Sequence, residues 1–216
     1  NNVNKFLNFI NNLLKFCVNL PHLFDMKKIL FCGLAASLII ISCKNLGSTL
    51  VKLNHSIKLK HVDRIVYFDP EVYPDFEEIK EPTNNVIYSA VSDELKNYGN
   101  YKIMHINNAN IKYDSVDVNM IKESCLNNGA EIALVPKVKY FKVGLGKYVF
   151  SNQVIVSMKM YNNDGELVIE NSYDTYKGSG RLLGSAENSI KIGTANVIKN
   201  MITELRSRNM TTPASE

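Results

Sequence analysis

Several chemistries have no support in this 216-residue chain, because the sequence lacks the motifs that they need. The four histidines, His22, His55, His61 and His105, are scattered, and none has the spacing of a zinc ligand pair. No Gly-x-x-x-x-Gly-Lys run is present to hold a nucleotide phosphate, and no Gly-x-Ser-x-Gly turn is present to carry a serine nucleophile. We therefore predict no catalytic residue, no metal and no cofactor, and expect that the chain is not an enzyme.

One stretch is far more apolar than anything after it. It starts at Met26 with two lysines and ends at Cys43, and it reads Met-Lys-Lys-Ile-Leu-Phe-Cys-Gly-Leu-Ala-Ala-Ser-Leu-Ile-Ile-Ile-Ser-Cys. A positive start, an apolar centre and small residues at the end are the layout of a secretory signal peptide. An uncleaved anchor and a buried core helix are the alternatives. The apolar centre is shorter than the roughly 20 residues of a membrane span, and the order of its parts favours the signal peptide.

The last four residues of this stretch, Ile-Ile-Ser-Cys, resemble the lipobox of bacterial lipoproteins. The resemblance implies cleavage between Ser42 and Cys43 and acylation of the Cys43 thiol, for example with palmitate. It thus implies a lipid anchor in a membrane of the cell envelope. Lys44 is not the aspartate that resembles an inner-membrane retention signal, which favours the outer membrane with the domain facing the periplasm.

Removing residues 1–42 changes the bulk properties of the chain. Four lysines and one aspartate leave with that segment, so 21 basic and 20 acidic side chains remain and the formal net charge falls from +4 to +1. Because no concentrated basic face is visible, we predict no nucleic-acid partner. Cys125 becomes the one thiol that is neither removed nor acylated, which excludes an internal disulfide, and we expect it to be a small buried residue of a helix.

The remaining chain predicts one α/β domain. We expect residues 1–25 to be an upstream extension, with an amphipathic arm as the alternative, and 26–42 to be the signal peptide. Residues 43–56 are then the lipidated N-terminus and a tether, 57–208 the domain and 209–216 a flexible tail. Within the domain, the hydrophobic periodicity predicts strands at 65–68, 101–106, 132–143, 149–161 and 167–176, and helices at 85–98, 117–126 and from Ser185 to about Leu205, with a loop at 70–83.

The element order is therefore β-α-β-α-β-β-β-α. The two connections that contain helices imply parallel neighbours, and the last three strands should form an antiparallel meander around an Asp-Gly turn at 164–165. We predict a two-layer sandwich of the α/β (α+β) class, with a mixed five-stranded sheet and three helices on one side.

Aromatic residues cluster around the predicted strands, and half of them must pack in the core. The rest are candidates for a partner surface, because tyrosine suits interfaces. The loops 70–83 and 145–150 are the best candidates for a recognition rim, so we predict partner contacts from Tyr73, Phe76, Tyr148 and Phe150.

Further sequence features extend the resemblance to residues 57–206: the strand Ile-Val-Tyr-Phe-Asp-Pro at 65–70, the Asn-Asn-Val-Ile helix start at 84–87 and the segment Asn-Gly-Ala-Glu-Ile-Ala-Leu-Val at 128–135. This pattern is similar to the periplasmic α/β domain of envelope lipoproteins related to the curli secretion channel subunit and the activators of peptidoglycan synthases. It implies a non-catalytic, lipid-anchored component that binds another envelope protein or assembles as a homo-oligomer. A surface-exposed lipoprotein that binds a ligand or host is the alternative, and an enzyme acting on the cell wall is a third.

Overall fold

The computed structural model describes residues 47–57, 59, 61–107, 109, 111–142, 150–179 and 185–211. The side chains of residues 142, 150, 151, 179 and 208–211 are not part of that description. The predicted signal peptide, its cleavage point at Ser42 and the acylated Cys43 all lie outside the described residues.

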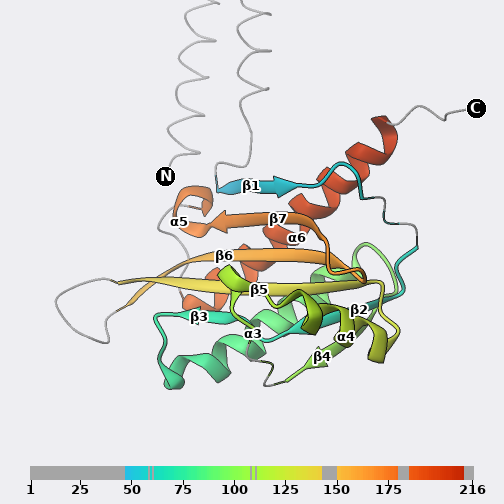
Figure 1. The fold of residues 1–216 in the computed structure, drawn as a ribbon. Coiled ribbons are helices and arrows are strands. Elements are labelled where there is room, and N and C mark those ends of the chain that lie inside the picture. The colour runs from blue at the N-terminus through green and yellow to red at the C-terminus, as the bar shows by residue number, and fades with distance from the viewer. Residues whose placement is uncertain are drawn as a thin grey trace, which may run out of the picture. The chain divides into compact units, whose positions relative to one another are not determined.

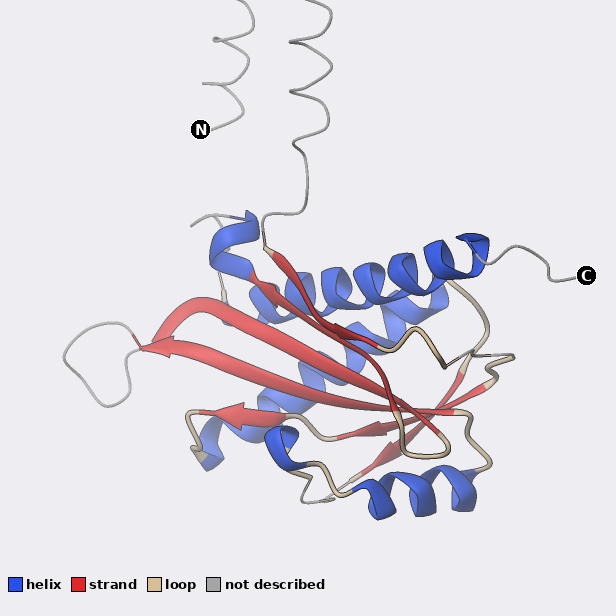
Figure 2. Ribbon diagram, turned by 45° about the horizontal axis from the view of Figure 1, so that its top comes forward, coloured by secondary structure: helices blue, strands red, loops and turns tan. Residues whose placement is uncertain are grey.

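The described residues form one mixed sheet with helices packed on both faces (Figures 1 and 2). The strand order is β1-β7-β6-β5-β2-β4, and β3 pairs with β5 in line with β2. The α+β class and the mixed sheet are confirmed, with seven strands where the sequence predicts five. The elements in chain order are β1 Ser48–Leu53, β2 Arg64–Phe68, β3 Glu71–Tyr73, α3 Glu77–Lys96, β4 Lys102–Ile106, the 3₁₀ turn η1 Tyr113–Ser115, α4 Val118–Asn128, β5 Ile132–Lys142, β6 Phe150–Asn162, β7 Leu167–Asp174, α5 Thr175–Ser179 and α6 Ala186–Thr211.

Strand β2 lies between the other two long parallel strands, β4 and β5. The chain therefore steps from β2 to β4 in one direction, and then steps back past β2 to reach β5. Since β-α-β crossovers are right-handed, two steps in opposite directions place their helices on opposite faces of the sheet. Helix α3 accordingly packs with α6 on one face and α4 packs on the other (Figure 2), so the expectation that all three helices share one side is wrong for α4.

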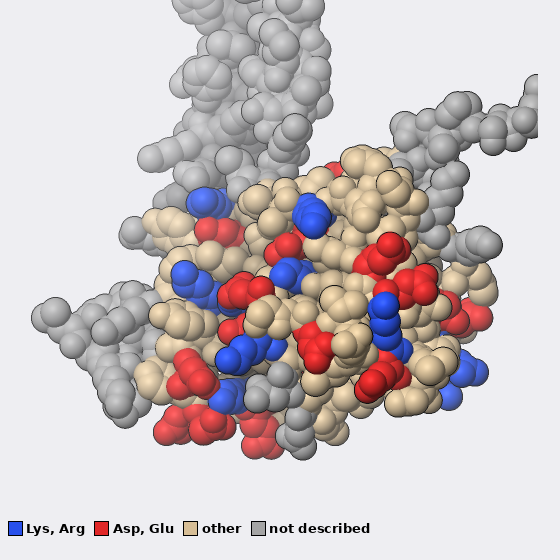
Figure 3. All heavy atoms as spheres, viewed as in Figure 1, with Lys and Arg blue, Asp and Glu red and all other residues tan. Residues whose placement is uncertain are grey.

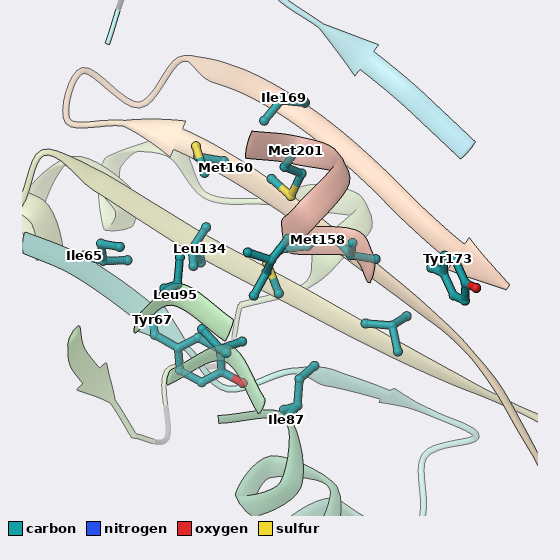
Figure 4. Packing of buried hydrophobic residues seen from close by; sticks show 14 of the residues in the cluster. Ile65, Tyr67, Ile87, Leu95, Leu134, Met158, Met160, Ile169, Tyr173 and Met201 are labelled. Atoms are coloured by element: carbon teal, nitrogen blue, oxygen red, sulfur yellow. The ribbon is translucent and has the colours of Figure 1, made fainter. Parts of the chain in front are cut away.

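Each face has its own core. The larger one joins α3 and α6 to the sheet, with side chains such as Tyr67, Met158 and Met201 fully buried (Figure 4). The smaller one lies under α4 and includes Phe68, Ile121 and Cys125. The described residues of both cores fall between Leu53 and Leu205. The alternation along β6 is as predicted: Val154, Val156, Met158 and Met160 face the larger core, and Tyr161 faces the smaller one.

The predicted tether at 43–56 is wrong over residues 48–53, because these residues form the edge strand β1, which pairs antiparallel with β7. Most of its side chains are exposed. An exposed edge strand such as β1 resembles a linker in its sequence, so its pairing with β7 is what shows that it is a strand.

Two further segments differ from the predictions. The predicted loop at 70–83 contains β3 and the first two turns of α3, which passes through Pro82. Pro82 lacks the N–H that would bond the carbonyl four residues back, and its ring crowds that carbonyl, so the helix continues through it at a cost. Glu77 and Glu78 at the start suit the positive end of the helix dipole. The predicted end of the last strand at 175–176 belongs instead to the short helix α5.

The predicted starts of two helices are confirmed. The Asp117 carboxylate accepts a hydrogen bond from the Asn119 backbone N–H at 2.9 Å and begins α4, and Gly129 ends this helix with a φ of +59°. The Ser185 hydroxyl accepts from the Asn188 N–H at 3.1 Å and caps α6. The turn at Gly165 has a φ of +73°, as an Asp-Gly hairpin turn requires.

Glu131 ties the start of β2 to the start of β5, and this contact predicts a pH effect on stability. Its carboxylate accepts from the backbone N–H of Arg64 at 2.7 Å and of Asp63 at 3.0 Å. The Arg64 N–H is the main cause that lowers the pKa of Glu131. Because the folded pKa is depressed, this stabilisation is present above the unfolded pKa of about 4.3 and is lost as pH falls through the folded value.

We therefore expect Glu131→Gln to lower the urea midpoint at pH 7, and the difference from the parent chain to narrow as pH falls below about 4.3, the unfolded pKa. Urea titrations of both proteins across that range measure it. Glu123→Gln, on the exposed side of α4, is the control and should leave the midpoint unchanged at every pH. A gap between Glu131→Gln and the parent that widens toward acid would contradict the assignment.

Candidate functional site

A pocket of about 440 Å³ opens where the parallel strands β2 and β4 end. Its walls come from the segment after β2 (Asp69, Pro70), from β3, from the start of α3 (Lys80, Asn84) and from the segment after β4 (Ile111, Lys112). Here the chain leaves β2 toward one face of the sheet and leaves β4 toward the other. Ligand sites of open α/β sheets lie in the crevice at such a switch point, outside the carboxyl ends of the strands.

The charged side chains that line this pocket are four carboxylates and two lysines: Asp69, Glu71, Asp75, Glu77, Lys80 and Lys112. The Lys80 ammonium lies 2.6 Å from a carboxylate oxygen of both Asp75 and Glu77, and these hydrogen bonds, the one to Asp75 first, raise the pKa of Lys80 to about 12. The Glu71 carboxylate accepts from the backbone N–H of Tyr113 at 2.7 Å. The rim of the pocket is therefore polar, and carboxylates outnumber lysines in it.

Behind the pocket lies an aromatic and ionisable cluster that the sequence does not reveal. His105 Nε2 lies 2.7 Å from a carboxylate oxygen of Asp69, and both side chains are half-buried. The His105 ring stacks on Tyr88 at 4.6 Å and meets the ring of Tyr67 edge-on at 5.3 Å. The Tyr67 hydroxyl is fully buried, and none of the described residues bonds to it. Burial is the main cause that raises its pKa, followed by the nearby Asp69 carboxylate.

A histidine–carboxylate pair can serve as a general base, but only beside a nucleophile or an acidic substrate proton. His105 is in register with Tyr67 and so faces α3, whereas Cys125 lies in the core on the other face. The sheet therefore separates the histidine from this thiol. The parallel register of β2 and β4 brings Asp69 to His105. The sequence signal that could have found the pair is that both residues lie at the ends of strands expected to be parallel neighbours.

The sheet face beside α4 carries a second polar network, centred on η1. The Tyr113 hydroxyl donates to the Glu170 carboxylate at 3.0 Å, and Lys159 Nζ donates to the Tyr113 carbonyl at 2.7 Å. Lys137 forms an ion pair with Asp114 at 2.6 Å. Figure 3 shows this side of the molecule, where Lys and Arg are interspersed with Asp and Glu over most of the face and acidic side chains gather at its lower left. A face with charges of both signs is better suited to bind a polar protein surface than a polyanion such as a nucleic acid.

Two of the four predicted partner residues are described, and both lie at the end of the sheet where the pocket opens. Tyr73, at the end of β3, is 55% exposed, and Lys139 Nζ lies 5.7 Å from the centre of its ring. Phe76 is half-buried just before α3. Tyr148 lies outside the described residues, as does the side chain of Phe150.

The pairing of β5 with β3 and β6 brings the end of β3 and the start of β6 to this same end of the sheet. Tyr73 is opposite Lys139, and Lys142, three residues further along β5, is opposite Phe150. A second hollow of about 330 Å³, lined by Pro82, Tyr140 and residues of α6, lies on the other side of the start of α3. We call this end, with Tyr73, Phe76 and the two hollows, the strand-end surface.

Cys125 is buried in α4, as predicted, and burial raises the pKa of its thiol to about 11. We expect it to react with a disulfide reagent such as DTNB at pH 8 on the order of 100-fold more slowly in the folded protein than in urea. A full-chain variant whose other three cysteines are serine isolates this thiol. Equal rates with and without urea would show that Cys125 is accessible.

Among the described residues, no three His, Cys, Asp or Glu side chains lie close enough together to hold a metal ion. Within the same residues, no helix has both the length and the hydropathy that crossing a membrane requires.

No family model matches this chain, and no curated protein matches it. Solved structures match in fold. The PelC dodecamer from Paraburkholderia phytofirmans is 11% identical, with a TM-score of 0.48, over 70% of this chain and 93% of that one. The lipoprotein GNA1162 from Neisseria meningitidis is 8% identical, with a TM-score of 0.36, over 67% and 99%. The LpoB C-terminal domain from Salmonella enterica is 10% identical, with a TM-score of 0.34, over 52% and 82%.

These proteins are similar to this chain in the arrangement of their elements. At identities of 8–11% and TM-scores below 0.5, none of them assigns a function to it.

Proposed function

We propose that the chain is a lipid-anchored lipoprotein of the bacterial cell envelope, and that its α/β domain binds another envelope protein or further copies of itself without catalysing a reaction. The observation that carries the proposal is the signal-like stretch at 26–43, which ends on Ser42 and Cys43. Its finer form places the protein in the outer membrane with the domain facing the periplasm, on the ground of Lys44 after the cysteine.

The strand-end surface is the proposed site of protein binding. Tyr73 is exposed, and the ammonium of Lys139 lies over its ring. A tyrosine held in this way offers a large contact area at little cost in side-chain entropy, and tyrosine is enriched at binding hot spots. The two hollows beside Tyr73 and Phe76 give side chains of a partner somewhere to insert. The charged side chains that line the pocket would surround the contact with the partner by polar groups.

The test is recovery of partners from solubilised envelopes, with chemical cross-linking to capture self-assembly. We expect Tyr73→Asp to reduce recovery of the partner, or of the cross-linked oligomer, by roughly tenfold or more, since a hot-spot residue contributes about 2 kcal/mol or more. Leu126→Asp is the matched control, because Leu126 is 81% exposed on α4, away from the strand-end surface. If Tyr73→Asp and Leu126→Asp recover the parent's partners equally well, the strand-end surface is not the binding site.

The pocket favours a second candidate function, a surface-exposed lipoprotein that binds a small ligand. Its volume of about 440 Å³ falls in the range of roughly 300 to 1,000 Å³ that ligand pockets occupy. Protease treatment of intact cells separates the two functions. Digestion of the domain would favour surface display, and full protection would favour the periplasm.

A further inference from the structure

The start of the domain is fixed to its body. The backbone N–H of Asp174 donates to the Gly47 carbonyl at 2.8 Å. A Cβ atom on Gly47 would lie 2.7 Å from the Asp174 carbonyl oxygen and 2.8 Å from the Gly178 Cα atom, so the slot between β7 and α5 has no room for a side chain. The chain therefore enters the domain through a tight gap at one defined place.

The next residue fixes the direction of entry. Asn200 Nδ2 on α6 donates to the Ser48 hydroxyl at 2.7 Å, and this hydroxyl lies 3.3 Å from Asn171 Oδ1 on β7. Two elements, α6 and β7, thus hold Ser48. The entry point is set relative to the sheet and to α6.

Only three residues, 44–46, separate Cys43 from Gly47. Four Cα-to-Cα steps of about 3.8 Å span at most about 15 Å. An acylated Cys43 lies at the bilayer interface, whose headgroup region is itself about 5 to 8 Å thick on each side. Since the entry point is fixed and the connection is short, the surface around Gly47 must stay close to the lipid.

That surface presents an aromatic residue and a lysine on a rigid support. In α5, Tyr176 is 48% exposed and the Lys177 side chain is 70% exposed. Thr175 fixes this helix to β6. Its buried hydroxyl accepts a hydrogen bond from the Val154 N–H at 2.9 Å and donates one to the Val154 carbonyl at 2.8 Å. The Asp174 carboxylate caps the helix by accepting from the Tyr176 N–H at 2.9 Å.

The adjoining strand adds apolar surface. Leu50 is 43% and Val51 is 55% exposed on β1. Six large hydrophobic side chains are exposed among the described residues, and three of them, Leu50, Val51 and Tyr176, belong to β1 and α5. Half of these exposed residues therefore belong to the two elements that lie beside the entry point.

We propose that this corner, made of residues 47–51 of the β1 segment and of Tyr176 and Lys177, is the face that the anchored domain lays against the bilayer. The Tyr176 ring lies in the headgroup interface, where an amphipathic ring is favoured, and the Lys177 ammonium reaches lipid phosphates. The inference rests on the proposed function, because it needs a lipid on Cys43. It goes further by assigning an orientation to the domain.

The protein has no tryptophan, so a single introduced tryptophan reports its own depth. We would use residues 43–216, which contain all the described residues of both cores, with Cys125→Ser so that Cys43 is the sole thiol. Cys43 is coupled to a maleimide lipid in phosphatidylcholine and phosphatidylglycerol vesicles that carry a nitroxide near the headgroup. Circular dichroism and a thermal melt confirm that each coupled variant is folded.

We expect nitroxide lipid to quench Tyr176→Trp fluorescence by roughly twofold or more, as for an interfacial aromatic residue, and to leave Leu126→Trp on α4 unchanged. Lys177→Trp is the second variant if Tyr176→Trp does not fold. Equal quenching at positions 176 and 126, or no quenching at 176 in fully coupled protein, would overturn the orientation.

Coupling Cys43 to a maleimide lipid in vitro allows the orientation to be tested separately from acylation in cells. Absence of acylated Cys43 in cells would end the lipid-anchor proposal and leave the vesicle measurement of this surface valid. Acylated Cys43 together with an unquenched Tyr176→Trp would end the orientation and leave the anchor in place.

Discussion

Cys43→Ala should abolish incorporation of labelled palmitate and leave the protein as a larger precursor that retains the residues before position 43. The physical reason is that alanine has no thiol to which the lipid could attach at position 43, and the resemblance to the lipobox implies acylation of that thiol before cleavage. Two or more acyl chains hold a protein firmly at a bilayer, whereas one holds it only marginally. We therefore expect complete loss of label and a shift in mass, measured by metabolic labelling and mass spectrometry of the intact protein.

Cys125→Ala is the matched control for this experiment, because Cys125 is the other cysteine beyond the predicted cleavage point and is buried in α4. It should retain the label, the mature mass and the membrane fraction. If Cys43→Ala still matured and partitioned with membranes like the parent, the signal at 26–43 would be an ordinary signal peptide or an anchor. The lipoprotein proposal would then fail.

The elements that could be predicted correctly from the sequence are those whose successive side chains face the two buried cores. Met158 and Tyr161 on β6 follow the expected faces, and the turn at Gly165 follows from its Asp-Gly pair. Strand β1 was missed for a physical reason: as an edge strand it exposes most side chains, so its pattern is that of a linker. The first turns of α3 were missed because Pro82 suggests a loop: a proline in the second turn disfavours a helix, and packing of α3 against the sheet overrides that preference.

The candidate site is less predictable than the fold, because its contacts join residues far apart in the chain. Asp69 and His105 are 36 positions apart, and only the parallel register of β2 and β4 joins them. Tyr73 and Phe76 could be placed at a rim because they follow a strand that ends in Asp-Pro. The pocket beside them depends on the segment after β4, which no local pattern ties to that strand.

The face of the sheet on which α4 packs could not be predicted from the hydrophobic periodicity of its sequence. A helix with apolar residues on one side can pack on either face of a sheet, and the hydrophobic pattern alone does not choose between them. The choice follows once the strand order is known, because the crossovers to β4 and back to β5 run in opposite directions.

Ile121→Ala should destabilise the domain by about 2 to 5 kcal/mol, which is a large part of the roughly 5 to 15 kcal/mol that holds a typical domain folded. Ile121 is 0% exposed and packs in the core between α4 and the sheet. Truncating it removes the transfer free energy of the lost carbons and leaves a cavity that this close packing cannot fill. Urea unfolding at pH 7 measures the change in the free energy of unfolding.

Leu126→Ala on the same helix is the control that makes the test specific. Leu126 is 81% exposed, so its truncation should change the free energy of unfolding by no more than about 0.5 kcal/mol, while its effect on helix propensity is small. Because both residues lie between the Asp117 cap and the Gly129 stop, a difference between them reports burial against the sheet and not the strength of the helix. Equal destabilisation by the two substitutions would mean that α4 does not present this side to β2 and β5, and the two-faced arrangement of the sheet would be wrong.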